Sequence, residues 1–172
     1  MNYKIIKDTI YPKNGLENWK RKTVRALLIN DNKIGLLHIK GDEPDFGIRN
    51  HLETPGGGID DDDESPIDAL KREILEETGY TIKDIKYVTT VAVEYNPLNR
   101  IDVSKIYACH VDENTNKTAL LDYEKEIFDS FDFYDLETIE GTFKIIHDDK
   151  VSKLIYQRDL YAINKYKKMC KK

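Results

Sequence analysis

Cysteine is scarce in this sequence. Its two cysteines, Cys109 and Cys170, stand far apart in the chain. This pair supplies neither a disulfide framework nor the four thiolates of a cysteine-rich zinc site. So few thiols fit a reducing compartment, and we expect the protein to be cytoplasmic.

Long hydrophobic runs are also missing. No stretch approaches the roughly 20 apolar residues that a membrane-crossing helix needs. The first residues, MNYKIIKDTIYPKNG, interrupt their apolar positions with charges and lack the continuous apolar region of a secretion signal. We therefore expect a soluble protein that is not exported and has no membrane partner.

The third absence is an excess of positive charge. The chain has 27 basic and 32 acidic residues, which gives a net charge of -5. Tight sequence-independent binding to nucleic acid depends on a basic surface that neutralises phosphates. We therefore expect no nucleic acid polymer as a partner, whereas small nucleotides remain possible ligands.

The sequence does contain enough material for one domain. It has 172 residues, of which 40% are hydrophobic, and this suffices for a single core. No internal repeat, low-complexity linker or Pro/Gly/Ser-rich boundary divides it. We expect residues 1–172 to form a single domain.

Hydrophobic patterning predicts both strands and helices. Two aliphatic runs flank Asp31-Asn32, a pair that tolerates a tight turn, and therefore predict a hairpin. Residues 41–50 are rich in turn formers and predict a loop, as does Pro55-Gly56-Gly57-Gly58. We expect strands over 22–30, 33–40, 85–95, 104–111 and 127–134, and helices over 66–78 and 154–169. This order favours an α/β fold with a mixed β-sheet sandwiched between helices.

The first of these helices has an unusual acidic face. Ser65-Pro66 is a favourable helix start and Gly79 a favourable stop. Within these limits Glu73, Glu76 and Glu77 are spaced i, i+3 and i+4, so their carboxylates project from one patch. Like charges at this spacing repel by a few tenths of a kcal/mol per pair, which favours a cation placed over them.

A hard divalent cation suits this patch. Carboxylate oxygens are ligands for Mg²⁺ or Mn²⁺, and no neighbouring His or Cys favours zinc. A water acidified by such a metal is the nucleophile that diphosphate hydrolysis requires. The glycines before the helix allow the backbone to approach a phosphate, and one of their carbonyls can add a metal ligand. Acidic residues on an exposed helix are more often merely solvated, so further signals are needed.

Such a signal is present over residues 58–80, which read GIDDDDESPIDALKREILEETGY. This segment resembles the Nudix box: glycine, five residues, glutamate, seven residues, then Arg-Glu-aliphatic-x-Glu-Glu-x-Gly-aliphatic or aromatic. All of its fixed positions are filled, by Gly58, Glu64, Arg72, Glu73, Ile74, Glu76, Glu77, Gly79 and Tyr80. The chain is thus similar to the Nudix hydrolases, which are α/β/α sandwiches that cleave diphosphate linkages.

The resemblance assigns roles to residues of the box. It implies that Glu73, Glu76 and Glu77 bind Mg²⁺ or Mn²⁺, that one of them can act as base, and that the Gly58 carbonyl adds a ligand. Arg72 is expected to support catalysis by pairing with a box glutamate and fixing its rotamer, with Glu64 in a similar supporting role. Homodimers are common among such proteins, so a homodimer is a possible assembly.

Substrate-binding residues are expected outside the acidic patch. Gly57 lets backbone approach a phosphate, and Arg49 can hold a second phosphate, although a loop arginine is more often solvated. Many Nudix hydrolases add a carboxylate from a later loop; Glu124 and Glu126 are the two candidates, and the sequence does not choose between them. Trp19, Phe46 and Tyr95 can stack on a base, although aromatic residues mostly pack into cores.

Residues outside the box indicate the substrate class. Glu53-Thr54-Pro55-Gly56 is similar to the Glu-x-Pro-Ala/Gly segment of the ADP-ribose and ADP-sugar pyrophosphatases, so we include Glu53 among the substrate-binding candidates and favour an ADP-ribose-like nucleotide. A proline typical of that branch is displaced here, where Pro97 follows Tyr95. Nucleoside triphosphates are the second choice and dinucleoside polyphosphates the third.

Two other functions use the same fold. Isopentenyl diphosphate isomerases need a catalytic cysteine, and Cys109 lies in an apolar strand without an obvious activating partner. A catalytically inactive nucleotide sensor would usually lack some box glutamates, and here none is missing. A metal-dependent pyrophosphohydrolase is therefore the favoured function.

Overall fold

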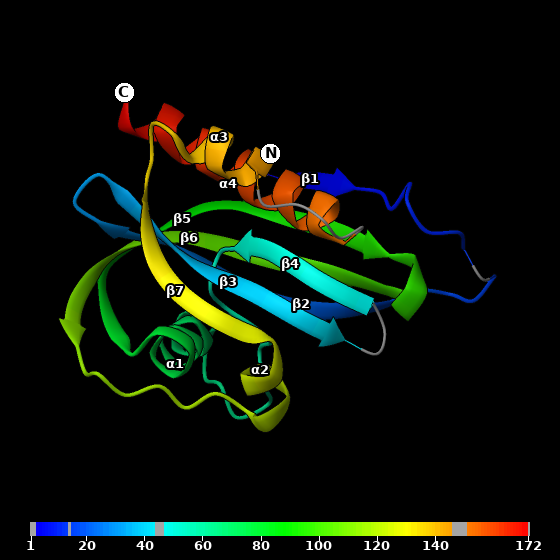
Figure 1. Ribbon diagram of the computed structural model, residues 1–172, viewed down its shortest axis with the longest axis horizontal. Helices are drawn as coiled ribbons and strands as arrows, with labels where there is room; N and C mark the ends of the chain where they lie inside the picture. The colour runs from blue at the N-terminus through cyan, green and yellow to red at the C-terminus, as the bar shows by residue number, and fades with distance from the viewer. Residues whose placement is uncertain (1–2, 14, 44–46, 146–150, 172) are drawn as a thin grey trace.

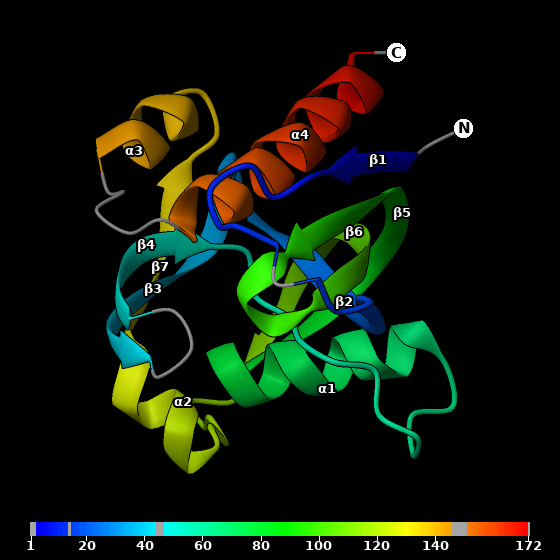
Figure 2. The same cartoon turned by 90° about the vertical axis from the view of Figure 1, so that its right-hand side faces the viewer.

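The computed structural model describes residues 3–13, 15–43, 47–145 and 151–171. Helix α1 (Pro66–Thr78) covers one face of a seven-stranded sheet, and α3 (Ile139–Ile145) and α4 (Ser152–Cys170) cover the other (Figures 1 and 2). The α/β/α sandwich expected from the sequence is confirmed.

The sheet is mixed. Its order is β1-β5-β6-β2-β3-β4, and β7 also pairs with β3. The pairs β1–β5 and β2–β6 are parallel, while the remaining pairs are antiparallel. The strands are β1 (Tyr3–Ile6), β2 (Trp19–Asn30), β3 (Lys33–Glu43), β4 (Gly47–Glu53), β5 (Tyr80–Tyr95), β6 (Arg100–Asn114) and β7 (Phe128–Asp135). A short 3-10 helix, η1 (Asn96–Leu98), joins β5 to β6, and α2 (Asp122–Ile127) precedes β7.

Each sheet face has its own hydrophobic core. Along β2, Leu27 and Ile29 belong to the core beneath α3 and α4, whereas Ala26 and Leu28 belong to the core beneath α1. This alternation follows from the two-residue period of a strand. The sheet is therefore apolar on both sides in its centre, as a three-layer sandwich requires.

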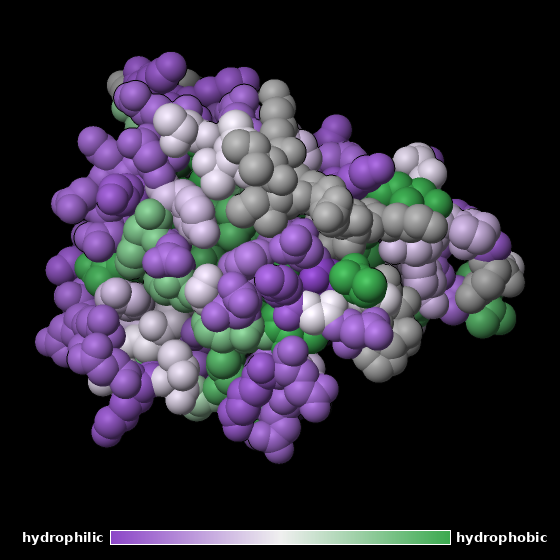
Figure 3. All heavy atoms as spheres, in the orientation of Figure 1, coloured by the Kyte–Doolittle hydropathy of each residue, from purple (hydrophilic) through white to green (hydrophobic). Residues whose placement is uncertain are grey.

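The face of the molecule drawn in Figure 3 is mainly polar. Hydrophilic residues cover most of the face drawn in Figure 3, and hydrophobic residues show between them in separate groups. Within the described part of the chain, no helix combines the length and hydrophobicity needed to span a bilayer.

Several elements agree with their sequence patterns. The helix over residues 66–78 is confirmed: the Ser65 hydroxyl accepts from the Asp68 N–H at 3.3 Å, and Gly79 ends the helix with a φ of 74°. Asp31 adopts a φ of 54° in the turn between β2 and β3, as the expected hairpin requires.

The loop expected over residues 41–50 is wrong for its described residues. There β3 continues to Glu43 and pairs with β4, with Gly41 opposite Arg49. The structure explains why Gly41, a turn former, occurs in this strand. A Cβ at Gly41 would lie 2.8 Å from the Ile127 side chain and 3.0 Å from the Glu126 carbonyl, so glycine makes room for α2. The pattern also missed β1, α2 and α3.

The glycine-rich loop after β4 lies along β2. The Ala26 N–H donates to the Pro55 carbonyl and the Val24 N–H to the Gly57 carbonyl, both at 2.9 Å. A Cβ at Gly56 would lie 2.9 Å from the Arg25 Cα, and its φ of 132° also favours glycine. This close approach holds the loop between β2 and α1, where the site is formed.

Candidate active site

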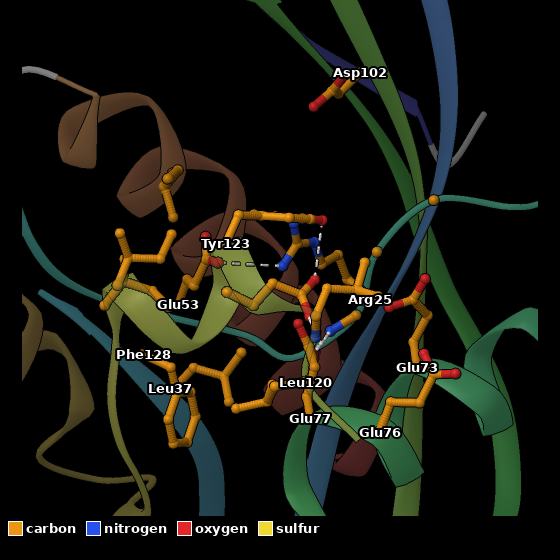
Figure 4. Close-up of a pocket in the computed structure, with 18 of the residues that line it drawn as sticks. Arg25, Leu37, Glu53, Glu73, Glu76, Glu77, Asp102, Leu120, Tyr123 and Phe128 are labelled. Atoms are coloured by element: carbon orange, nitrogen blue, oxygen red, sulfur yellow. Dashed lines mark hydrogen bonds and ion pairs between the residues drawn. The ribbon is translucent and has the colours of Figure 1, made fainter. Parts of the chain in front are cut away.

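A cavity of about 270 Å³ opens between α1, β2, β4, the glycine-rich loop, α2 and α4. Figure 4 shows the three box glutamates, Glu73, Glu76 and Glu77, on the α1 side of this cavity. Leu37 and Phe128 lie on its apolar side. The cavity therefore joins an acidic helix to an apolar wall.

The box glutamates differ in their surroundings. Glu73 is 9% exposed, whereas the Glu76 side chain is 38% exposed. The Glu77 carboxylate accepts a hydrogen bond of 2.6 Å from the Gly56 N–H, which ties the helix to the glycine-rich loop. The three carboxylates thus range from enclosed to open toward the cavity.

Burial shifts the pKa of two of the three box glutamates. It raises the pKa of Glu77 well above its usual range, and the charges of Glu73 and Glu53 act in the same direction, while Arg25 and the Gly56 N–H oppose them. Burial also raises the pKa of Glu73, although Arg72 opposes this shift. In the ion-free protein these carboxyl groups therefore hold protons more strongly than free glutamates do.

Arg72 bridges several of these groups. Its guanidinium donates to both carboxylate oxygens of Asp63, at 3.1 and 2.8 Å. It also donates to Glu73 at 2.9 Å, to Glu76 at 3.2 Å and to the Gly58 carbonyl at 3.1 Å. The expected pairing of Arg72 with a box glutamate is present. Glu64, expected to act beside it, is exposed instead, and Asp63 receives the guanidinium.

Gly57 leaves the space that Glu73 occupies. A Cβ at this position would lie 2.6 Å from the carboxyl carbon of Glu73, which is far inside van der Waals contact. Any larger residue would have to displace the carboxylate. The absence of a side chain at Gly57 therefore determines where the Glu73 carboxylate can lie.

The cavity is also lined by a second charged group, the inner wall, formed by Arg25 of β2, Glu53 of β4 and Arg158 of α4. Arg25 Nη1 lies 3.6 Å from Glu53 Oε1, and Arg158 Nη2 lies 3.8 Å from Glu53 Oε2. Burial raises the pKa of Glu53, but Arg25, His51 and Arg158 together outweigh it and hold this pKa well below its usual range. Glu53 is therefore an ionised acceptor at the cavity wall.

Sequence reasoning missed both arginines of the inner wall. A signal was present for each. Arg25 interrupts the apolar run of β2, and Arg158 falls on the buried stripe of α4 between Ile155 and Ala162. Charged residues at core positions usually have buried partners or a functional role.

The remaining substrate-binding candidates differ in whether they line the cavity. Arg49 is 6% exposed, lines the cavity and lies 3.1 Å from His51, measured between Nη2 and Nε2. Glu124 also lines the cavity, where the Tyr123 hydroxyl donates to it at 3.1 Å. Glu126 is exposed and is absent from the cavity lining. The geometry therefore favours Glu124 over Glu126.

The aromatic candidates have different positions. Tyr95 is 4% exposed and lines the cavity. Trp19 is 54% exposed, and the Arg100 guanidinium lies 5.9 Å from its ring centroid. Phe46 lies outside the described residues. Tyr95 is thus mainly a core residue with one edge at the cavity, while Trp19 stands outside it.

Cys109 lies outside the cavity. It is buried in the core beneath α1 and does not line the cavity. Burial raises the pKa of its thiol to about 12, so it is protonated near neutral pH. An isomerase that depends on this thiol is not supported.

The box offers a set of possible metal ligands. Gly58, Glu73, Glu76 and Glu77 offer only oxygen, the donor type that Mg²⁺ and Mn²⁺ prefer. As they stand, no three acidic, His or Cys side chains among the described residues converge around an ion. Instead the Arg72 guanidinium contacts three of these four groups and balances part of their charge. The residues fit a divalent cation in chemistry and charge, provided that Glu73 and Glu76 turn from Arg72 toward it.

Comparison with known proteins identifies the family. Residues 19–154 match the NUDIX domain model, so the chain belongs to the Nudix family. With its complete box it is a Nudix-type pyrophosphohydrolase, and proteins of this family generally use divalent metal ions. A search of the curated proteins gives no match.

Solved structures share the fold at low sequence identity. A NUDIX hydrolase from Nitrosomonas europaea superposes with a TM-score of 0.65 at 19% identity, covering 86% of this chain and 88% of its own. The NUDIX domain of Shewanella oneidensis NrtR, in complex with ADP ribose, gives 0.63 at 18% identity, covering 93% and 94%. An ADP compounds hydrolase gives 0.62 at 18% identity, covering 88% and 73%.

Proposed function

We propose that this protein hydrolyses the diphosphate linkage of a nucleoside diphosphate joined to another group, with an ADP-ribose-like nucleotide as the preferred substrate. The observation that carries the proposal is one cavity that is lined both by the box glutamates and by the arginines Arg25, Arg49 and Arg158. A molecule with two phosphates in its centre can meet both groups of residues at once.

Glu73, Glu76, Glu77 and the Gly58 carbonyl would hold Mg²⁺ or Mn²⁺. When bound, such an ion supplies positive charge to the reacting phosphates and acidifies water. Arg72 keeps its paired contact with Asp63 and so remains beside the site as a support when Glu73 and Glu76 turn away from it.

The residues of the chain then perform the remaining tasks. A box glutamate accepts the proton of the attacking water, whose oxygen bonds to one phosphorus while the bridging P–O bond breaks. Gly57 allows the backbone to approach the phosphates, and Arg49 neutralises the second phosphate. Glu124 supplies a further carboxylate from α2.

Three observations support the ADP-ribose-like preference. The Glu53-Thr54-Pro55-Gly56 segment is similar to that of the ADP-ribose branch, and Glu53 lies at the cavity wall as an ionised acceptor for substrate hydroxyl or amino groups. Two structures of the same fold are described as an ADP compounds hydrolase and as a complex with ADP ribose. The apolar wall with Leu37, Phe128 and Ile127 offers a surface for a base.

A substrate panel tests the proposal. ADP-ribose, ADP-glucose, diadenosine polyphosphates, ATP and GTP are incubated with the protein and Mg²⁺, and the products are resolved by ³¹P NMR. We expect AMP and ribose 5-phosphate from ADP-ribose as the fastest reaction. Faster release of pyrophosphate from a triphosphate would overturn the substrate preference. Binding across the panel without any turnover would replace the hydrolase with a nucleotide sensor.

A further inference from the structure

Helix α4 carries two charged residues where a helix normally packs apolar ones. Arg158 is 2% exposed and Asp159 is fully buried. Arg158 donates to Asp159 from Nε at 2.7 Å and from Nη2 at 3.1 Å. A buried ion pair contributes little stability compared with an apolar pair of similar size, so its presence calls for another explanation. Both residues lie beyond residues 19–154, the part that matches the family model.

Asp159 holds the start of the glycine-rich loop. One of its oxygens accepts from the Thr54 N–H at 2.9 Å, and the other accepts from the Thr54 hydroxyl at 3.0 Å. All of these atoms are buried. Thr54 directly precedes the segment 55–58, whose opposite edge is bonded to β2. The loop is therefore clamped between β2 and α4.

The clamped loop contacts residues of the Nudix box. Two residues after Thr54, the Gly56 N–H donates to Glu77 at 2.6 Å. The next glycine, Gly57, packs against the Glu73 carboxylate, and the Gly58 carbonyl accepts from Arg72. A shift of the loop at Thr54 would therefore move the groups that surround the box glutamates.

Within the inner wall, Arg158 lies beside Glu53. It lines the cavity although its side chain is only 3% exposed, and its Nη2 lies 3.8 Å from Glu53. Arg25 approaches the other oxygen of Glu53 from β2, at 3.6 Å. Glu53 is therefore held between guanidinium groups that come from different layers of the sandwich.

We propose that Arg158 and Asp159 form a positioning pair for the active site. Asp159 fixes the glycine-rich loop against which the box glutamates lie, and Arg158 fixes Glu53 where it faces the substrate. This inference rests on the proposed function and extends its machinery to α4.

The mildest test changes Thr54, because loss of the buried pair itself can unfold the protein. Thr54→Val keeps the shape but removes the hydroxyl that donates to Asp159, whereas Thr54→Ser keeps the hydroxyl. We expect Thr54→Val to weaken Mn²⁺ binding, measured by titration without nucleotide, and to lower kcat, each by about 10-fold, as loss of such supporting contacts does. Thr54→Ser should restore both values to nearly those of the wild type.

The pair itself is tested with Asp159→Asn and Arg158→Met. Asp159→Asn should behave like Thr54→Val, since an amide nitrogen cannot accept from Thr54. Arg158→Met should raise KM for ADP-ribose by about 10-fold with a smaller change in kcat, because it releases Glu53 rather than the loop. Gln157→Ala, an exposed change on the same helix, is the matched control and should alter neither constant.

The outcomes separate this inference from the proposed function. If the wild type hydrolyses a diphosphate and folded Thr54→Val and Arg158→Met match it in Mn²⁺ affinity, kcat and KM, the positioning role is overturned alone. If the variants merely melt earlier while those constants stay unchanged, the pair is structural and the inference is again overturned. A wild type that neither binds Mn²⁺ nor hydrolyses any diphosphate overturns both.

Discussion

Helix α1 and the inner wall carry charge in different ways. At α1, Glu73 and Glu76 of the helix share the guanidinium of Arg72 with Asp63 of the preceding segment. At the inner wall, Glu53 has two arginines beside it, and one of them, Arg158, also pairs with Asp159. The acidic side therefore has room for a cation from outside, whereas the inner wall is already balanced by residues of the chain. Changes on α1 should act mainly on metal binding and kcat, and changes at the inner wall mainly on substrate binding.

The largest expected effect is that of Glu77→Gln. It removes a negative charge from the proposed metal site without changing the side-chain volume. We expect kcat to fall at least about 100-fold, while the folded structure is kept. Steady-state kinetics together with circular dichroism check this prediction. Wild-type turnover in a folded Glu77→Gln protein would contradict the role assigned to α1.

A change next to α1 should have the next largest effect. The added methyl of Gly57→Ala must displace the Glu73 carboxylate, and we expect activity to fall by about 10- to 100-fold. The matched control is Gly141→Ala in α3, where a Cβ would meet no atom within 4 Å. Kinetics of both variants test the claim, which fails if Gly57→Ala and Gly141→Ala are equally active.

Metal binding should depend on pH. Because burial raises the pKa of Glu77, metal coordination must displace a proton from this carboxyl group at any pH below that pKa. Affinity for Mn²⁺ should therefore increase as the pH rises, and level off above the pKa of Glu77. Calorimetric titrations in buffers with different ionisation enthalpies measure the released protons. Equal binding enthalpies in all buffers would show that no proton leaves.

The smallest effect distinguishes two neighbours in α2. Glu124 lines the cavity and Glu126 does not. Glu124→Gln should therefore reduce kcat measurably, whereas Glu126→Gln should stay within about 2-fold of the wild type, as an ordinary surface change does. Steady-state kinetics of the two variants under the same conditions test this prediction. A larger loss of kcat in Glu126→Gln than in Glu124→Gln would assign the further carboxylate to Glu126.

The features predicted from the sequence are the local ones. Helix α1 was predictable because its cap, its apolar stripe and its stop lie within one short segment, and the box glutamates follow from its period. The hairpin at Asp31 was predictable for the same reason.

Features made by distant residues were not predicted. Thr54 and Asp159 meet across 105 positions, and no local pattern links them. Gly41 resembles a turn residue in isolation, and only the packing of α2 explains its place in β3. Likewise, Asp63 rather than Glu64 meets Arg72, because the path of the chain before the helix decides which neighbouring acid faces inward. Tertiary contacts override local preference at these positions.

The central claim is that the oxygen donors around α1 hydrolyse a diphosphate only with a divalent cation. The most direct measurement follows ADP-ribose by ³¹P NMR with the wild-type protein in excess EDTA, and then after addition of Mg²⁺ or Mn²⁺ beyond the chelator. We predict no turnover in EDTA and recovery of AMP and ribose 5-phosphate formation once the ion is supplied. Undiminished hydrolysis in EDTA would contradict the claim.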